Sequence, residues 1–264
     1  MGKLMGSVWV KREVCQAMTT KVFAPGGYRF IPAVFQYSGG VAAEPGFAIR
    51  RVRFRAPIPL AQGFTAVERL IAAAGRPMTS FCACELRSPA PFTDQGFRGF
   101  NEQYVVTLGK WGIYDGKTNP VARSNVCPEI DPPAEPSFHA FAFTVAAPAA
   151  PSFVVAGSGE AREGGQTYGE NIVRRGETSP DAMRAKAAFV HGEMERRLGL
   201  LGFGWKDTTA TQVYTVHDLF PFLADDIIRR GAAHAGLTWH FCRPPVRELE
   251  YEMDCRGVAL EEVV

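Results

Sequence analysis

The sequence contains no long apolar run, no signal-like beginning and almost no net charge, and each absence excludes a class of protein. No apolar run approaches the roughly 20 residues needed to cross a bilayer. The first ten residues lack the basic start and apolar stretch of a secretory signal peptide, so we expect a cytoplasmic protein. The 264 residues carry a net charge of only +2. That value argues against a dedicated nucleic-acid binder, which usually has a large basic excess.

Motifs for metals, nucleotides and disulfides are also missing. None of the five histidines belongs to an HExxH pattern, and the isolated glycine pairs do not form a phosphate-binding loop. We therefore predict that the protein uses no metal and no cofactor. The six cysteines lack the paired spacing of a zinc finger, so we expect reduced thiols that pack as small apolar side chains. They are Cys15, Cys82, Cys84, Cys127, Cys242 and Cys255.

The chain does contain the same order of predicted elements twice, on either side of a segment rich in proline and alanine at 145–152. The first half predicts a strand at 28–37, a helix at 59–74, a strand at 79–86, a helix at 97–111, and strands at 121–127 and 137–145. The second half predicts a strand at 153–156, a helix capped by Ser179, a strand at 209–216, a helix at 220–232, and strands at 239–242 and 246–254. We expect an α+β fold of two tandem subdomains, 1–147 and 148–264. Each should be a mixed sheet with two helices packed on one face.

A run of arginines lies at 50–55. On a strand, Arg51, Arg53 and Arg55 would share one face. Two interpretations stay open. The arginines could form a solvated strand face or protect a sheet edge by their charge, or they could attract an anionic substrate.

One arginine lies beside a small hydroxyl residue where a strand is predicted to begin, at Arg123 and Ser124. Arginine is well suited to bind a carboxylate, because its planar fork offers two parallel donors. Far along the chain, Glu250 and Glu252 alternate with apolar residues on another predicted strand. An arginine and a strand-borne glutamate, without a metal or nucleotide motif, indicate acid–base chemistry on a small carboxylate substrate.

These features resemble the Rid family, the reactive intermediate deaminases that are also called YjgF-like. The resemblance covers nearly the whole chain, once in each half. Neither half is complete, because the first has Ser137-Phe138-His139 where the family has its glutamate, and the second lacks the Asn-x-x-Tyr motif. The matching motifs are Tyr37-Ser38-Gly39-Gly40, repeated as Gly157-Ser158-Gly159-Glu160, then Asn101-Glu102-Gln103-Tyr104, Val121-Ala122-Arg123-Ser124 and Glu250-Tyr251-Glu252.

The resemblance implies a cofactor-independent hydrolysis of an enamine or imine to a ketone and ammonia. It implies one composite site, with Arg123 from the first half as a clamp on the substrate carboxylate and Glu250 from the second half as the group that activates water or moves the proton. Further residues are expected to bind substrate, orient the clamp, line the cleft or hold a second carboxylate. These are Ser38, Asn101, Ser124, Tyr28, and Arg243 or Arg247.

The enlarged, two-part layout is most similar to deaminases that act on 2-aminomuconate or its chlorinated relatives in aromatic-ring degradation. Rid proteins are usually trimers with sites between neighbouring subunits, so the resemblance also implies a homo-oligomer.

Two other functions stay open on the sequence. A chorismatase-like hydrolase would use arginines and a glutamate in the same way, and a non-catalytic ligand-binding protein would explain the incomplete motifs. Structural roles also stay open for single residues. Arg123 would then bond a loop carbonyl, Glu250 and Glu252 would face solvent, and Asn101 would be a surface or capping residue.

Overall fold

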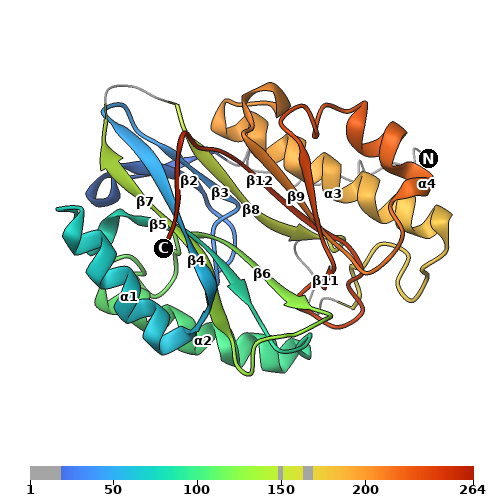
Figure 1. Cartoon of the computed structure of the whole chain (residues 1–264), viewed down its shortest axis with the longest axis horizontal. Coiled ribbons are helices and arrows are strands. Elements are labelled where there is room, and N and C mark those ends of the chain that lie inside the picture. The colour runs from blue at the N-terminus through green and yellow to red at the C-terminus, as the bar shows by residue number, and fades with distance from the viewer. Residues whose placement is uncertain (1–18, 148–150, 163–168) are drawn as a thin grey trace, which may run out of the picture.

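The computed structural model describes residues 19–147, 151–162 and 169–264. Two mixed β-sheets form the centre of the molecule, and the helices lie on their outer faces (Figure 1). No helix in this part of the chain is long and apolar enough to span a membrane. The predicted α+β class, with two mixed sheets, is confirmed.

The first sheet has six strands in the order β11-β6-β5-β7-β4-β13. Its parallel pairs are β5–β6 and β4–β13, and the other neighbours are antiparallel. Helices α1 (Leu60–Ala73) and α2 (Asp94–Lys110) pack on one face of this sheet. The strands are β4 (Phe47–Pro59), β5 (Phe81–Arg87), β6 (Ala122–Pro128), β7 (Ser137–Ala146), β11 (Cys242–Arg243) and β13 (Leu260–Val263).

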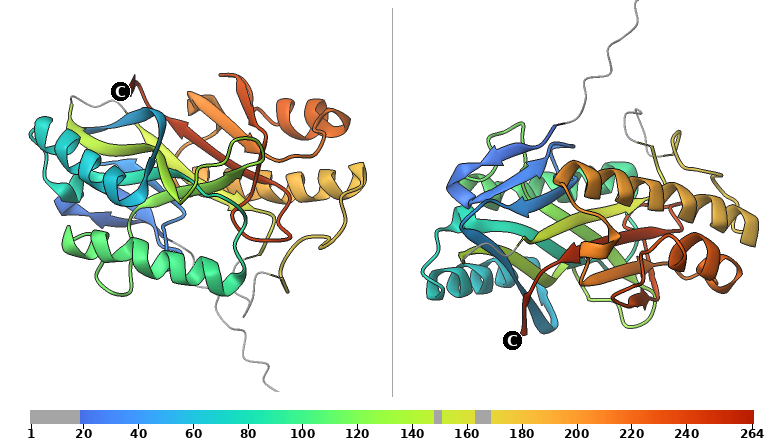
Figure 2. Two further views of the ribbon diagram at one scale, coloured as in Figure 1. Left: turned by 60° about the horizontal axis from the view of Figure 1, so that its bottom comes forward. Right: turned by 90° about the horizontal axis from the view of Figure 1, so that it is seen from above.

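The second sheet has seven strands in the order β1-β2-β3-β8-β12-β9-β10. Helix α3 (Pro180–Leu201) covers its outer face, together with α4 (Phe220–Phe222) and a π-helical turn at Leu223–Ile228 (Figure 2). The strands are β1 (Lys21–Phe23), β2 (Tyr28–Ile31), β3 (Gly40–Ala43), β8 (Phe153–Gly159), β9 (Ala210–Tyr214), β10 (Leu237–His240) and β12 (Glu252–Gly257). Short 3-10 turns lie at Ala24–Gly26, Met78–Ser80 and Trp205–Asp207.

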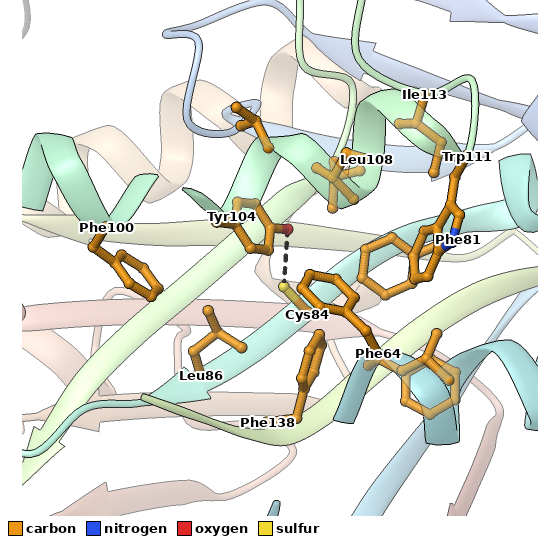
Figure 3. Close-up of a cluster of buried hydrophobic side chains, with 14 of the residues drawn as sticks. Phe64, Phe81, Cys84, Leu86, Phe100, Tyr104, Leu108, Trp111, Ile113 and Phe138 are labelled. Carbon is orange, nitrogen blue, oxygen red and sulfur yellow. Dashed lines mark hydrogen bonds between the residues drawn. The ribbon is translucent and has the colours of Figure 1, made fainter. Parts of the chain in front are cut away.

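The three long helices pack as their sequences predict, although α2 begins at Asp94, three residues before the predicted start. The Thr93 hydroxyl accepts a hydrogen bond from Gly96 N at the start of α2, and the Ser179 hydroxyl accepts one from Ala182 N at the start of α3. The apolar stripe of α1, which includes Phe64, packs with aromatic residues of α2 and the sheet in one core (Figure 3). In α3 the predicted stripe is fully buried, at Met183, Ala187, Val190, Met194 and Leu198.

The two sheets exchange strands across the middle of the chain. Strands β2 and β3, from the beginning of the chain, reach the second sheet through pairing of β3 with β8. Strands β11 and β13, from its end, pair with β6 and β4 of the first sheet. The proposed boundary after residue 147 thus separates the two helical layers but cuts through both sheets. Residues 148–150 of the predicted linker lie outside the described residues.

Several predicted elements were wrong in extent. The strand expected at 28–37 ends at Ile31, the helix expected at 220–232 is a short α-helix followed by the π-helical turn, and the strand expected at 246–254 begins only at Glu252. Strand β3 and the long strand β4 were not predicted. Local propensity and apolar period could not foresee β3 and β4, because each has one neighbouring strand from the other half of the chain, β8 and β13 respectively.

The inner faces of the two sheets meet in a layer of buried polar residues. Arg51 lies there at 5% exposure and donates to both carboxylate oxygens of Glu85, at 2.6 and 2.9 Å. A solvated strand face was therefore the wrong interpretation for Arg51, although Arg55 is exposed. The five described cysteines are buried free thiols, as predicted, whereas Cys15 lies outside the described residues.

Candidate active site

Arg123 is a buried cation on β6 that forms no ion pair with a carboxylate of the described residues. Its side chain lies under α2 at 3% exposure, and its Nη1 has no hydrogen-bond partner. Tyr104 and Tyr37 are the nearest rings, at 4.9 and 5.2 Å from the guanidinium carbon. Phe97 and Phe100 follow, each at 5.6 Å. Aromatic faces attract a cation, but they do not satisfy its N–H groups, so the guanidinium is prepared to bind an anion.

A cavity of about 40 Å³ lies beside Arg123, and residues from both halves of the chain line it. Strand β6 and helix α2 form one side, and β8, β12 and the preceding loop form the other. The walls are mostly apolar, with three polar side chains among them. The lining residues are Tyr37, Phe97, Arg123, Asn125, Gly157, Gly159, Pro245, Val246, Leu249 and Glu252.

Glu252, the first residue of β12, supplies the carboxyl group of this cavity. Its exposure is 4%. Burial raises the pKa of the Glu252 carboxyl well above its ordinary value, and the charges of Asp254 and Glu160 add to the rise, while Arg123 and Arg87 oppose it. Desolvation therefore favours the neutral, protonated form of this carboxyl. It can therefore act as a general acid.

Asn125 was missed by the sequence analysis. Its Oδ1 accepts a hydrogen bond from the Ser88 hydroxyl at 2.9 Å, which directs Nδ2 the other way. Nδ2 is buried and has no partner, and Asn125 lines the same cavity as Arg123. Residues two apart on a strand point to the same side. That spacing from Arg123 was the signal in the sequence.

Glu250 and Arg243 lie together in a different place. The Glu250 carboxylate is 2.7 Å from Nε2 of His217 and 3.9 Å from Nη1 of Arg243. Arg243 binds both carboxylate oxygens of Glu129, at 2.7 and 3.0 Å. Neither residue lines the cavity of Arg123. On a regular strand, Glu250 and Glu252 would point to the same side. Glu250 lies before the first paired residue of β12, so its side chain does not follow this rule.

Ser124 points to the opposite side of β6, into the polar layer between the sheets. Its hydroxyl donates to Asp254 at 2.5 Å, and Gln212 and Tyr214 donate to the same carboxyl group. Burial raises the pKa of Asp254, and the charge of Glu85 adds to this, whereas the hydrogen bonds from Ser124 and Gln212 oppose it. Ser124 and Asp254 line a second cavity of about 10 Å³ with Arg123, which has room for about one water molecule.

The other predicted residues make hydrogen bonds to the backbone. The Ser38 hydroxyl donates to Pro120 O at 3.1 Å, and the Asn101 amide donates to Phe97 O at 2.7 Å, one turn earlier in α2. The Tyr28 hydroxyl donates to Phe81 O at 3.2 Å. None of these three lines either cavity beside Arg123. In the described part of the chain, no three His, Cys, Asp or Glu side chains are grouped so that they could hold a metal.

A buried arginine and a buried carboxyl whose pKa is raised thus line one cavity, and they come from opposite halves of a two-sheet α+β fold. The family model "2-aminomuconate deaminase CnbZ" matches residues 20–262. The chain therefore belongs to this family, which confirms the resemblance that its motifs showed.

Comparison with curated proteins and solved structures gives further likenesses. The chain is 56% identical over 246 residues to a 2-amino-5-chloromuconate deaminase of Comamonas testosteroni, which covers 92% of this chain and 98% of that protein. A chorismatase structure is 11% identical to this chain. The match covers 83% of this chain and 77% of the chorismatase chain, with a TM-score of 0.46. A Thermotoga maritima protein described as a candidate endoribonuclease is 18% identical to this chain. The match covers 50% of this chain and 91% of the Thermotoga chain, with a TM-score of 0.33. Both TM-scores are below 0.5, so the fold is assigned from the strand order of the two sheets.

Proposed function

We propose that this protein is a cofactor-independent hydrolytic deaminase of a 2-aminomuconate-type enamine carboxylate, which it converts to a ketone and ammonia in aromatic degradation. Membership of the family and the name of the Comamonas relative support the reaction class. One observation carries the assignment of the site. Arg123 and Asn125 line the same cavity as Glu252, whose carboxyl pKa is raised, and each holds a buried nitrogen, Nη1 and Nδ2, that has no hydrogen-bond partner among the described residues.

The two donors bind the carboxylate next to the amino-bearing carbon. Arg123 supplies charge, and Asn125 supplies a second N–H whose direction Ser88 fixes. Hydrogen bonds to a charged group contribute about 1.5–3 kcal/mol each. A cavity of about 40 Å³ holds about three water-sized groups. It therefore takes the carboxylate and amine end of the substrate, and the remainder extends past the apolar wall of Val246 and Leu249.

Glu252 is the acid and then the base. Its carboxyl gives a proton to the enamine carbon, and the nitrogen lone pair forms the C=N bond of an iminium. Water then adds to the carbon of the C=N bond, and the Glu252 carboxylate accepts the proton that water loses. The carbinolamine transfers a proton to its nitrogen, the C–N bond breaks, and ammonia leaves as the C=O bond forms. The sum is enamine plus water giving ketone plus ammonia, with Glu252 returned to its protonated form.

This role falls to Glu252 in place of Glu250, which the sequence analysis had chosen. Glu252 lines the cavity of Arg123, whereas Glu250 is paired with His217, and these two side chains are only 18% and 25% exposed. Ser124 remains beside the site through the second cavity, next to a place for one water molecule. Ser38, Asn101 and Tyr28 hold the surrounding backbone, and Arg243 lies in the cluster of Glu250.

The direct test is ammonia release by the purified protein from 2-aminomuconate and its 5-chloro derivative, followed together with the loss of substrate absorbance. A monocarboxylate enamine such as 2-aminoacrylate and an unrelated substrate, chorismate, serve as comparisons. We expect turnover of the dicarboxylates and none of chorismate. Binding of the dicarboxylates without ammonia release would contradict the proposal and favour a ligand-binding role.

Three expectations from the sequence stand as further proposals. We propose a cytoplasmic location, two units that meet at residue 147/148 and share strands in both sheets, and a homo-oligomer that is a trimer, as is usual in the family. Light scattering on the purified protein measures the mass in solution, and the mass of a single chain, 28.8 kDa, would contradict the last of them.

A further inference from the structure

A buried ion pair lies behind β12 and takes no part in the reaction steps above. Lys186 of α3 and Glu160, the residue after β8, both have side chains with zero exposure. The Lys186 ammonium donates to Glu160 Oε1 at 3.1 Å and to Val173 O at 2.8 Å. Burying two charges is costly, and their attraction repays the cost only when further hydrogen bonds satisfy them. A buried ion pair is therefore weak evidence for a stabilising role, and we looked for a positional role.

The Glu160 carboxylate also holds the backbone just before Glu252. Its Oε1 accepts from Glu250 N at 2.7 Å, and its Oε2 accepts from Tyr251 N at 3.1 Å. Strand β12 begins to pair with β8 only at Glu252, opposite Gly159. The side chain of Glu160 thus supplies the acceptors that a longer β8 would otherwise have supplied through its carbonyl groups.

This arrangement connects α3 to the proposed acid in two steps. The ammonium of Lys186 compensates the charge of Glu160, and Glu160 fixes the two peptide N–H groups that precede Glu252. Glu252 must be placed accurately, because its carboxyl lies against Gly157 with no room for a β-carbon there. We infer that the Lys186–Glu160 pair is a positioning unit that holds the Glu252 carboxyl over Gly157, facing the cavity of Arg123. The inference rests on the proposed role of Glu252.

Loss of Lys186 should disturb this unit in a defined way. Burial raises the pKa of Glu160, and Lys186 opposes that rise. Without Lys186 the pKa of Glu160 rises further, which favours the protonated carboxyl. A protonated oxygen is a poorer acceptor, so one of the two N–H groups loses its bond and the backbone before Glu252 shifts.

The test compares Lys186→Met with the double variant Glu160→Gln/Lys186→Met. The single variant should lose about tenfold or more in kcat, since misplacement by about 1 Å costs up to 10², while KM changes less than threefold because Arg123 and Asn125 are untouched. In the double variant the amide oxygen accepts one N–H without a buried charge. We expect it to regain at least part of kcat. Arg184→Met, on the same helix, removes a cation from the surface pair with Asp226 and should change neither constant.

The pH profile separates positioning from mere stability. The groups whose charges act on Glu252 are Asp254 on its own strand, Glu160 after β8, Arg123 on β6 and Arg87 on β5. When Glu160 is neutral, its charge no longer raises the pKa of Glu252. The alkaline limb of the kcat/KM profile should then move to lower pH in Lys186→Met. A purely structural role would lower the melting temperature but leave this limb in place.

A readout without activity keeps this inference apart from the proposed function. Carbon-13 NMR of glutamate-labelled protein, with the Glu252 signal assigned by its loss in Glu252→Gln, follows the titration of this carboxyl directly. A lower pKa in Lys186→Met would support the positioning unit even if no ammonia were released. A folded Lys186→Met protein with the parent's kcat, KM, pH limb and Glu252 titration would overturn it.

Discussion

The carboxyl of Glu252 lies so close to Gly157 that a β-carbon on the glycine would stand 2.2 Å from Oε1 and 3.2 Å from Cδ. The same β-carbon would lie 3.2 Å from the Cα of Ser124. An alanine at 157 would therefore push the Glu252 side chain out of its place. We predict that Gly157→Ala lowers kcat by about 10², the usual effect of moving a catalytic group by about 1 Å.

Gly99→Ala is the matched control for that change. A β-carbon on Gly99 in α2 would meet nothing within 4 Å. This variant should be fully active and more stable by up to about 1 kcal/mol, because alanine favours a helix. Equal activity of Gly157→Ala and Gly99→Ala in steady-state assays would show that Glu252 has no fixed position to lose.

Arg123→Met should abolish binding of the substrate carboxylate without unfolding the protein. The change removes the charged donor but keeps an apolar side chain among the rings of Tyr37 and Tyr104, and replacing a buried charge by an apolar group is often neutral or stabilising. We expect kcat/KM to fall by at least about 10² and the urea midpoint to stay or rise. Arg98→Ala, an exposed arginine of α2 paired with Glu102, controls for the loss of a cation near the site.

Asn125 provides a test of the second donor. Asn125→Asp keeps the shape but places a carboxylate against that of the substrate, so KM should rise by more than the roughly 10- to 150-fold expected for a lost bond to a charged group. Ser88→Ala removes the hydrogen bond that orients the Asn125 amide and should have a smaller effect in the same direction. Unchanged KM in both variants would place the substrate carboxylate elsewhere.

Glu252→Gln should give an inactive protein that is more stable at alkaline pH. The folded-state pKa of Glu252 is raised, so its contribution to stability is present at low pH and is lost as pH rises through that pKa. Glutamine never ionises and avoids this cost. Urea unfolding at pH 5 and pH 8 should show a gain over the parent that is larger at pH 8. A loss of stability that is the same at both pH values would contradict a buried, protonated carboxyl.

Short-range patterns predicted the three long helices well, but not the predicted helix at 220–232, and they predicted the sheets poorly. The Ser179 cap and the stripe from Met183 to Leu198 specify α3 locally, so the sequence alone predicted it. The pairing of Gly40 with Val155 and of Leu260 with Arg50 joins distant segments, and no local period encodes such partners. The charged face of β4 was misleading for the same reason, because Glu85, which neutralises Arg51, comes from another strand.

The candidate site was partly predictable. Arg123 followed from the chemistry of arginine beside a small residue and from the resemblance to the Rid family. The choice between Glu250 and Glu252 depended on where β12 begins to pair, and strand ends are set by tertiary contacts such as the bonds from Glu160. Asn125 could be recognised as a candidate only from the structure, which shows that its Nδ2 is buried without a partner among the described residues.

The central claim is that the acid is Glu252 and not its neighbour in the same motif, and kcat of Glu252→Gln and Glu250→Gln on 2-aminomuconate compares the two directly. Loss of a positioned acid–base group costs about 10²–10⁴ in rate, so Glu252→Gln should fall in that range. Loss of the part-exposed pair with His217 should cost less than about fivefold, as for other exposed ion pairs. A Glu252→Gln protein with nearly the parent's kcat, beside an inactive Glu250→Gln protein, would contradict the account.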